Sequence, residues 1–334
     1  MRILIIANYK PDLGGISGQV ELLSRNLLNE GHIVRIFSTK KSIIQRLWLI
    51  FSLAFAGRKY EIFHIHACSD WGFFPAVLGV MVGKLQRKKI ILTYHGGKAE
   101  SFFDHHPQLV RYFLCKTDAN IVLSVFLAKI FDMHKIPYHI IPNILEFKDH
   151  ILKKRTTINP RFISTRTLTP TYNIGCIIKA FEMVQQQIPS SELYIVGEGS
   201  SRNELEEMVR QKKLKNIHFC GRVKNCEIYS YLEKADIFIS SPIVDNQPMS
   251  ILEAFNAGLL VISSHVGGIP YLIEDGVTGY LFESDNEKQL ADCMIKAIQD
   301  EKHSIEMIKN GNKELIKYQW QYIRNKIYSI YFTI

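Results

Sequence analysis

The sequence predicts an α/β protein built from two Rossmann-like domains. In both halves of the chain, apolar segments of strand length are followed by turns that contain glycine and then by segments with helical periodicity, as in residues 1–38 and 192–208. The 334 residues are enough for two domains of roughly 100 to 200 residues each. Because 47% of the residues are apolar and no low-complexity tract occurs, we expect a globular chain.

The N-terminal segment predicts a βαβ unit. Residues 1–9 form an apolar strand, Asp12–Gly18 a glycine-rich loop, residues 20–32 a helix that ends at Gly31, and residues 33–38 the next strand. Glycines in such a turn let main-chain amides face a phosphate or an acceptor. A glycine-rich loop alone is a weak indication of this function.

Two further strands, at residues 61–66 and 90–97, end in a histidine or a glycine-rich turn. His64 and His66 lie on the same face of their strand, which permits metal binding. The sequence offers no evident third ligand, so we favour a structural role for this pair. Taken by itself, His95 at the end of the second strand is also more often structural.

A linker is predicted at residues 149–160, where mixed charge and Pro160 favour an exposed connection between separately folded halves. The first domain is therefore expected at residues 1–148 and the second at 161–315. The aromatic-rich residues 316–334 are expected to form a C-terminal helix.

Three strands in the second half end in an arginine or in glycines. Arg166 follows a strand at residues 161–165, and a lone arginine at a strand end is usually solvated. Gly197 and Gly199 form a turn between a strand and a helix, and Gly221 ends the next strand. Such βα corners bring backbone N–H groups and a helix N-terminus toward one point.

The most informative stretch is Ser240–Tyr271. It follows an apolar strand at residues 235–240 and contains Pro248, which suits the first turn of a helix, and Gly258, which ends that helix. A strand, a polar loop and a helix start in this order place free N–H groups and the positive end of the helix dipole where a diphosphate could bind.

Two carboxylates bracket this loop. Glu253 lies about one turn into the helix, where it could accept hydrogen bonds from two ribose hydroxyls, and Asp245 lies in the loop, where it could hold hydroxyls of a sugar. A second glycine turn, Gly267 and Gly268, would let the backbone approach a ligand closely. Taken singly, each residue favours an ordinary strand–loop–helix with a solvated Asp and a salt-bridged Glu.

The combination is more specific. Asp245 and Glu253 are separated by seven residues, and EA-x-x-x-G and a GG turn follow. This pattern resembles the retaining glycosyltransferases of family 4, and the other motifs match in the expected order over nearly the whole chain. The resemblance implies the GT-B architecture, in which two Rossmann-like domains face each other across a cleft and a C-terminal helix crosses back to the first domain.

The resemblance also implies a reaction. A sugar would pass from a nucleotide-sugar donor to a glycan or lipid-linked acceptor, with retention of anomeric configuration and with no metal or other cofactor. The implied catalytic residues are His95, Asp245 and Glu253. The residues implied in donor binding are Gly15, Arg166, Gly197, Gly199, Gly221, Asn246, Met249, Ser250 and Glu253.

The chain departs from the family pattern at three places. Asp245 stands where the family usually has a glutamate. Ile144 stands where the family's I-P-N-G-V turn has its glycine, and Tyr172 and Asn173 occupy the neighbourhood of a lysine and glycine that grip the diphosphate. One positive charge on the phosphates is therefore missing or supplied elsewhere.

The positive charge of the chain lies mostly in its first half, because residues 1–150 carry 19 Lys and Arg against 11 Asp and Glu. In this half the apolar run Leu47–Gly57, flanked by basic residues, is much shorter than the ~20 residues that a membrane span needs. Two interpretations are open. The run could lie on an anionic membrane surface, or it could be a helix buried against the first sheet.

The six cysteines have neither C-x-x-C pairing nor zinc-like spacing, which indicates reduced thiols in a cytoplasmic compartment. Because residues 3–7 begin a strand, we expect no signal peptide. The protein would be cytoplasmic, either free or peripheral on the inner face of the membrane.

Three other functions are considered. A nucleotide-sugar epimerase of the same architecture would need acid and base carboxylates around the sugar. A catalytically silent nucleotide-binding protein is suggested by Asp245, Ile144 and the missing lysine. A nucleic-acid binder is suggested only by charge and is disfavoured, because the lysines are dispersed and no basic motif with interleaved aromatic residues occurs.

Overall fold

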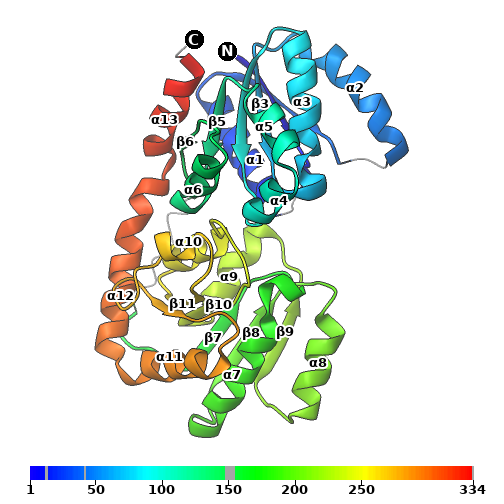
Figure 1. The fold of residues 1–334 in the computed structure, drawn as a ribbon. Helices are drawn as coiled ribbons and strands as arrows, with labels where there is room; N and C mark the ends of the chain where they lie inside the picture. The colour runs from blue at the N-terminus through cyan, green and yellow to red at the C-terminus, as the bar shows by residue number, and fades with distance from the viewer. Residues whose placement is uncertain (12–13, 41–42, 147–154, 333–334) are drawn as a thin grey trace. The chain divides into compact units, whose positions relative to one another are not determined.

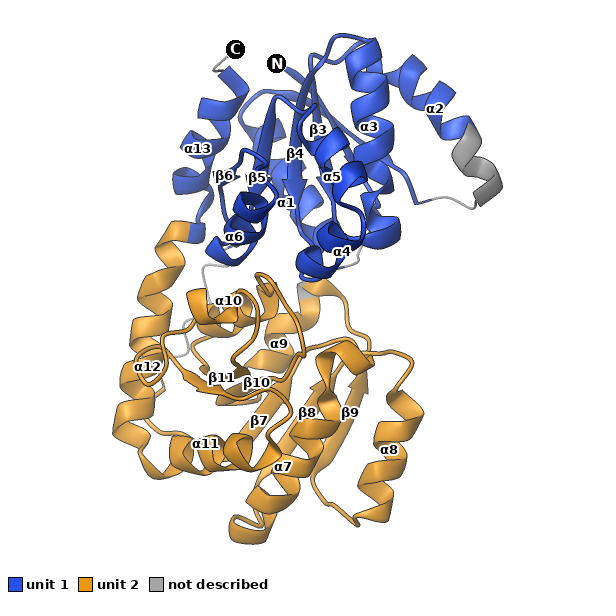
Figure 2. Cartoon of the chain, in the orientation of Figure 1, with its two compact units in different colours: residues 1–146, 318–334 blue, residues 147–317 orange. Residues whose placement is uncertain are grey.

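The structure, a computed structural model, describes residues 1–11, 14–40, 43–146 and 155–332. The chain divides into two compact units (Figure 2), one formed by Met1–Glu146 with Tyr318–Ile334 and the other by Phe147–Lys317. Each unit contains a six-stranded sheet in which neighbouring strands pair in parallel. The predicted α/β class with two Rossmann-like domains is confirmed.

The first unit has the strand order β2-β1-β3-β4-β5-β6 (Figure 1). Its strands are β1 (Arg2–Ala7), β2 (Ile33–Ser38), β3 (Ile62–Ala67), β4 (Lys89–Tyr94), β5 (Ala119–Val122) and β6 (His139–Ile140). Its helices are α1 (Ile16–Asn29), α2 (Ile43–Gly57), α3 (Phe74–Leu85), α4 (Ala99–His105), α5 (Pro107–Leu114), α6 (Val125–Met133) and α13 (Trp320–Phe332). The residues of β3 are buried throughout, as expected for a central strand that is covered on both faces.

Helix α1 begins earlier than expected. It starts at Ile16, inside the loop that was predicted at Asp12–Gly18, and Gly15 is its N-cap residue. Gly15 has φ 66°, a left-handed conformation that glycine adopts without steric cost. The glycine-rich turn therefore ends earlier than predicted, at Gly15, and Asp12 and Leu13 lie outside the described part of the chain.

The C-terminal helix α13 packs onto the first unit, as predicted. Ile323, Ile327 and Ile330 join the same buried cluster as Ile3 and Ile5 of β1. Burying such side chains contributes roughly 1.5–3 kcal/mol each. Since these residues are far apart in the sequence, the helix closes the first unit's core from the chain's other end.

Helix α2 has one buried face and one exposed face, so it has a feature of each interpretation of the apolar run. Leu49 and Leu53 are buried in the unit's core, whereas Trp48, Phe51 and Phe55 are between 71% and 77% exposed. The interpretation as a helix buried against the sheet therefore describes only one of its two faces. No helix among the described residues is long and apolar enough to cross a membrane.

The second unit has the strand order β12-β11-β10-β7-β8-β9. Its strands are β7 (Arg161–Ser164), β8 (Glu192–Val196), β9 (Ile217–Gly221), β10 (Ile237–Ser240), β11 (Leu260–Ser264) and β12 (Tyr280–Phe282). Its helices are α7 (Ile174–Gln187), α8 (Arg202–Gln211), α9 (Ile228–Leu232), α10 (Met249–Asn256), α11 (Glu287–Gln299) and α12 (Glu301–Lys313). Numbered from β7, this is the Rossmann order 3-2-1-4-5-6, whose direction reverses between β7 and β10. Ligands of such sheets bind where the carboxyl ends of these two strands meet.

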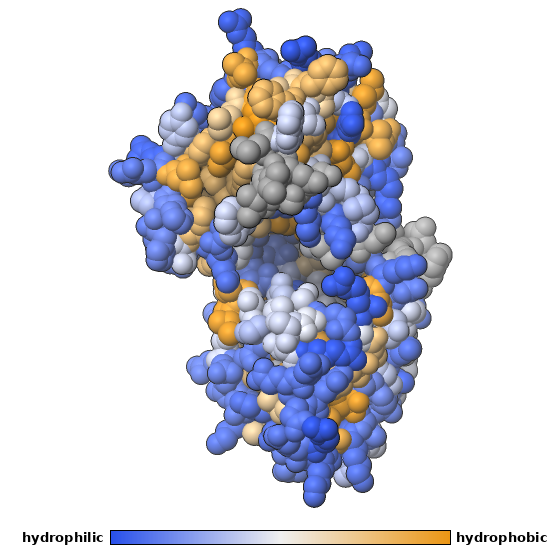
Figure 3. Space-filling view, turned by 90° about the vertical axis from the view of Figure 1, so that its right-hand side faces the viewer, coloured by the Kyte–Doolittle hydropathy of each residue, from blue (hydrophilic) through white to orange (hydrophobic). Residues whose placement is uncertain are grey.

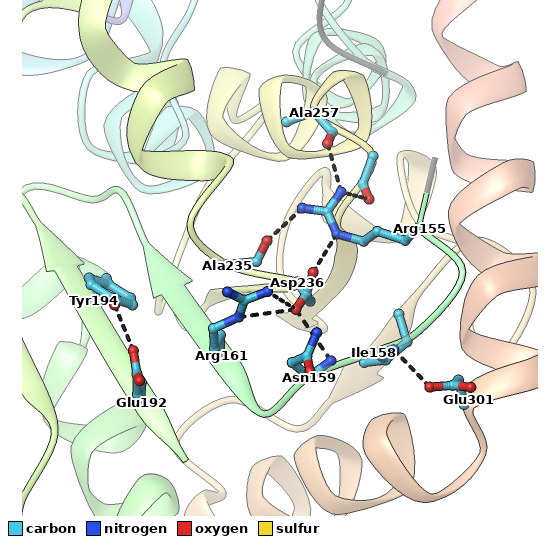
Figure 4. A network of polar contacts seen from close by, with 11 residues as sticks. Arg155, Ile158, Asn159, Arg161, Glu192, Tyr194, Ala235, Asp236, Ala257 and Glu301 are labelled. Carbon is cyan, nitrogen blue, oxygen red and sulfur yellow. Dashed lines mark hydrogen bonds and ion pairs between the residues drawn. The ribbon is translucent and has the colours of Figure 1, made fainter. Parts of the chain in front are cut away.

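The end of the predicted linker is exposed only in part, because two of its residues are buried. Residues 149–154 lie outside the described residues, but Arg155 and Ile158 are buried in the second unit. The Arg155 guanidinium donates to Asp236 and to main-chain carbonyls (Figure 4). Because all these partners cover the charge, a basic residue that we expected in solvent belongs to the core.

Candidate functional site

The reversal point of the second sheet carries two of the predicted site residues. Arg166 follows β7, Asp245 follows β10, and the Arg166 guanidinium donates from Nη2 to Asp245 Oδ2. Both side chains are largely buried, with 9% and 18% of their surfaces exposed. The strand order thus brings together two loops that are 79 residues apart in sequence.

Helix α10 begins beside this ion pair. Arg166 Nη1 donates to Ser250 Oγ at 2.7 Å, which ties the arginine to the first turn of the helix. Glu253, three residues after Ser250, lies on the same face of the helix and is partly buried. Pro248 is the N-cap residue, one position earlier than expected, and Gly258 follows the end of the helix with φ 66°, as predicted.

The Arg166 guanidinium also stacks on Tyr172, with Cζ 4.1 Å from the ring centroid. Tyr172 occupies the neighbourhood where the resemblance places a lysine, so a ring that holds the arginine stands in place of a second cation. The next residue, Asn173, adopts a left-handed conformation with φ 44°, which asparagine tolerates better than most residues. Asn173 can therefore keep the backbone turn at the position where the family pattern has a glycine.

The glycines of this site serve close packing between loops. A Cβ atom at Gly267 would lie 2.0 Å from Asp245 O, and one at Gly268 would lie 1.8 Å from Asn246 O. We expected the GG turn to make room for a ligand, but the close approach that the structure records is to the loop that carries Asp245. Gly268 N also donates to Asp245 O at 3.0 Å, so this turn fixes the Asp245 backbone.

The turn of Gly197 and Gly199 does the same on the other side. A Cβ at Gly197 would lie 2.1 Å from Arg166 O, and one at Gly199 would lie 2.1 Å from Leu168 O. These contacts hold the backbone after β7 in place. Gly221, at the end of β9, has φ 70° and no backbone atom close to its Cβ position.

The two remaining donor-binding candidates of this unit lie at the start of α10. Asn246 is 1% exposed and donates its backbone N–H to Asp245 Oδ1 at 2.8 Å, and Met249 is the first residue of the helix. Both oxygens of the Asp245 carboxylate therefore have a donor, one from Arg166 and one from the backbone.

In the first unit, His95 follows β4 and is joined to β3. His95 Nε2 and His66 Nδ1 are 2.9 Å apart, and the two rings stack. Burial lowers the pKa of His95 to about 3, and burial together with neighbouring histidines lowers the pKa of His66 well below its usual value. Both rings are therefore neutral at physiological pH, and one of them donates to the other.

His64 is bound on both nitrogens. Its Nδ1 lies 2.6 Å from the Tyr331 hydroxyl and its Nε2 lies 2.8 Å from Thr93 Oγ1, so its role is structural, as expected. A cavity of about 30 Å³, lined in part by His64, His66, His95 and Asn143, lies in this unit. Across the residues described, no cluster of three or more His, Cys, Asp or Glu side chains is arranged to hold a metal ion.

The predicted residues fall into two groups. Arg166 donates hydrogen bonds to both Asp245 and Ser250 in the second unit. Gly15 and His95 belong to the first unit. The sequence analysis did not predict the stacking of Tyr172 on Arg166. The aromatic ring in the place of the expected lysine could have suggested it.

The comparisons with known proteins agree with this geometry. Residues 148–314 match the family model described as glycosyl transferases group 1. The chain belongs to this family. It is therefore a glycosyltransferase, and the epimerase and the catalytically silent protein are disfavoured.

Two relatives of this glycosyltransferase have names that refer to glycolipid or polysaccharide synthesis. Alpha-monoglucosyldiacylglycerol synthase of Streptococcus pneumoniae is 24% identical over 89% of this chain and 78% of its own length. The amylovoran biosynthesis glycosyltransferase AmsK of Erwinia amylovora is 30% identical over 42% of this chain and 36% of its own. Among solved structures, Anabaena HepE in complex with UDP and glucose has a TM-score of 0.79 at 17% identity and covers 100% of both chains. This likeness confirms the predicted GT-B fold.

Proposed function

We propose that this glycosyltransferase moves a sugar from a nucleoside-diphosphate donor to a glycan or lipid-linked acceptor with retention of configuration. The observation that carries the proposal is the assembly of Arg166, Asp245 and Ser250 at the reversal point of the second sheet. A buried arginine beside a helix N-terminus is suited to a diphosphate, because both offer N–H donors and positive charge.

The roles of the proposed residues follow from their chemistry. Arg166 and the N-terminus of α10 would offset the charge of the leaving diphosphate without a metal ion. Glu253 would accept the ribose hydroxyls, and Asp245 hydroxyls of the transferred sugar. Because Asp245 is proposed to bind hydroxyls of the sugar and not to attack its anomeric carbon, we favour a same-face reaction through an oxocarbenium-like state, in which the donor phosphate helps to deprotonate the acceptor. His95, neutral at physiological pH, would position the sugar and stabilise charge.

The donor is tested by a thermal-shift panel of UDP, GDP, ADP and their common sugar conjugates. A ligand that binds only the folded protein raises its melting temperature. At a free ligand concentration of a hundred times Kd, the free energy of unfolding increases by about 2.7 kcal/mol. We expect one nucleotide to raise the melting temperature selectively and the others to leave it unchanged. If none of the panel raises it, the proposed donor site is wrong.

The acceptor side is proposed to work at an anionic membrane surface, with the protein cytoplasmic and peripheral. Apolar residues are exposed on the side of the first unit that carries α2 (Figure 3). Trp48, Phe51 and Phe55, spaced by three and four residues, lie on one face of that helix, and exposed Arg58 and Lys59 follow it. An aromatic face with adjacent basic residues fits an interfacial helix, and an acceptor carried by a lipid would be found there.

Liposome flotation at low salt tests this surface. We expect the protein to float with vesicles of phosphatidylglycerol and phosphatidylcholine but less with phosphatidylcholine alone, since each basic residue near an anionic surface contributes about 1 kcal/mol. The double variant Phe51→Ser, Phe55→Ser should lower the bound fraction about tenfold or more, because burying a Phe side chain contributes roughly 1.5–3 kcal/mol.

The control is Phe332→Ser, which removes an aromatic side chain that is 63% exposed on α13 of the same unit. This variant should float like the unaltered protein. If the protein stays at the bottom with both kinds of vesicle, the proposed membrane contact is wrong. If the two variants lose the same share of the floating fraction, α2 is not the contact.

A further inference from the structure

Arg166 and Asp245 satisfy each other in the structure, although both are proposed to bind the donor. Arg166 Nη2 donates to Asp245 Oδ2, and the backbone N–H of Asn246 donates to Asp245 Oδ1 at 2.8 Å. Each oxygen of the carboxylate that would hold the transferred sugar thus already accepts one hydrogen bond. The cation that would hold the diphosphate is neutralised by it.

The arginine is the more firmly held of the two partners. Tyr172 stacks on its guanidinium and Ser250 accepts a hydrogen bond from Nη1. The Arg166 Nε–H is buried and, among the described residues, has no hydrogen-bond partner. A buried donor without an acceptor is costly, so an anion that supplied oxygens to this guanidinium would be bound favourably.

The carboxylate has fewer recorded partners than the guanidinium. Its backbone is fixed by the GG turn through Gly268, but the side chain contacts the guanidinium and the adjacent backbone N–H, and it is twice as exposed as that of Arg166. A rotation about the side-chain bonds of Asp245 would release the arginine without moving either loop.

A diphosphate at Arg166 changes the balance of charge. The diphosphate and the Asp245 carboxylate are both anions, and in a largely buried site they repel each other strongly when they share one cation. With Tyr172 in the place of a lysine, the guanidinium is the one cation in the contacts recorded for this assembly. The diphosphate and the carboxylate therefore compete for it.

We propose that Asp245 is the resting counter-ion of Arg166, that the donor diphosphate displaces it, and that the released carboxylate then binds hydroxyls of the transferred sugar. The inference rests on the proposed function, whose donor site it describes in more detail. Binding of the two ends of the donor would be coupled, because the sugar's carboxylate is available only after the diphosphate has taken the arginine. This coupling would then favour a complete nucleotide sugar over its nucleotide product.

The test is calorimetric titration of the unaltered protein and of Asp245→Asn with UDP, GDP and ADP, with the matching nucleosides and with the matching nucleotide sugars. Asparagine keeps the size of the side chain and removes its charge, so the fold is preserved. We expect Asp245→Asn to bind the cognate nucleoside diphosphate about tenfold more tightly, a change of about 1.4 kcal/mol. Its affinity for the nucleoside, which has no phosphate, should not change.

The variant should also lose the additional affinity that the sugar moiety gives the unaltered protein. Asp292→Asn is the control, because Asp292 is exposed on α11 of the same unit, and it should behave like the unaltered protein throughout. Unchanged or weaker binding of the nucleoside diphosphate by Asp245→Asn overturns the inference. So does binding by the unaltered protein that requires Mg²⁺ and loses that requirement in the variant, because the carboxylate would then hold a metal. Absence of binding by any of the three nucleotides to the unaltered protein contradicts the proposed function itself.

Discussion

Replacing Arg155 with alanine is expected to lower the free energy of unfolding of the second unit by about 3–5 kcal/mol, the usual cost of removing one partner of a buried ion pair. Arg155 Nε donates to Asp236 Oδ1 at 2.8 Å, and the two side chains are each 1% exposed. Burial raises the pKa of Asp236, but hydrogen bonds from Arg155 and Arg161 outweigh this and hold it below its usual value. Without Arg155, much of the compensation for this buried charge is lost (Figure 4).

The same substitution should loosen the helix of the candidate site. Arg155 Nη1 donates to the Ala257 carbonyl at 2.9 Å and also to that of Gly258, at the C-terminal end of α10. Carbonyls at a helix end need such donors, because no intrahelical N–H reaches them. Since α10 carries Ser250 and Glu253, the loss of stability should be accompanied by weaker nucleotide binding.

Differential scanning calorimetry measures the effect, and hydrogen exchange assigns it to the second unit. A loss of 3–5 kcal/mol corresponds to a fall in Tm of roughly 10 °C for a unit of this size. Arg210→Ala is the matched control, because Arg210 pairs with Glu207 at the surface with 78% of its side chain exposed, and such pairs contribute less than about 1 kcal/mol. Equal effects of the two substitutions would contradict the structural role of Arg155.

Patterns local in the sequence predicted the elements well. The strand expected at residues 235–240 is β10 at Ile237–Ser240, and the helix expected to end at Gly258 ends just before it. Both follow from properties of neighbouring residues, namely an apolar run of strand length and a glycine suited to a left-handed conformation. The predicted start of α1 was wrong by a few residues and the predicted position of Pro248 in α10 by one. Helix ends are difficult to predict, because several neighbouring residues can adopt the backbone geometry of a cap.

Pairings between distant side chains could not be predicted in the same way. Arg166 and Asp245 were each proposed for the donor, but their contact depends on β7 and β10 being neighbours, which is a property of strand order. The contact of His66 with His95 likewise depends on the register of β3 against β4, in which His66 is paired with Thr93. Sequence patterns give the residues at strand ends but not which ends meet.

Charge was the least reliable guide to burial. Arg155 lies in a stretch of mixed charge that we expected to be exposed, yet main-chain carbonyls and Asp236 surround its guanidinium. Conversely, the apolar run of α2 leaves Trp48 and Phe55 exposed. Whether a charge or an aromatic ring is buried depends on partners supplied by the rest of the fold, and these partners are absent from a local pattern.

Replacing Glu253 with alanine is expected to lower kcat/KM for the nucleotide sugar by at least about a hundredfold. In the proposed site this carboxylate accepts two ribose hydroxyls, and hydrogen bonds to a charged group contribute about 1.5–3 kcal/mol each. Glu253 lies in α10 on the face that also presents Ser250 to Arg166, so its removal should act on the donor and leave the core of the second unit intact. Steady-state kinetics with the donor found by thermal shift gives the change in kcat/KM.

The affinity for the free nucleoside separates Glu253 from Asp245. Because the ribose belongs to the nucleoside, Glu253→Ala should weaken nucleoside binding in a calorimetric titration, whereas Asp245→Asn should leave it unchanged. Glu306→Ala, at an exposed position of α12, is the control and should retain normal kinetics and binding. Near-normal kcat/KM for Glu253→Ala, in a protein whose melting temperature is unchanged, would mean that the ribose is bound elsewhere and that the donor pocket has been misplaced.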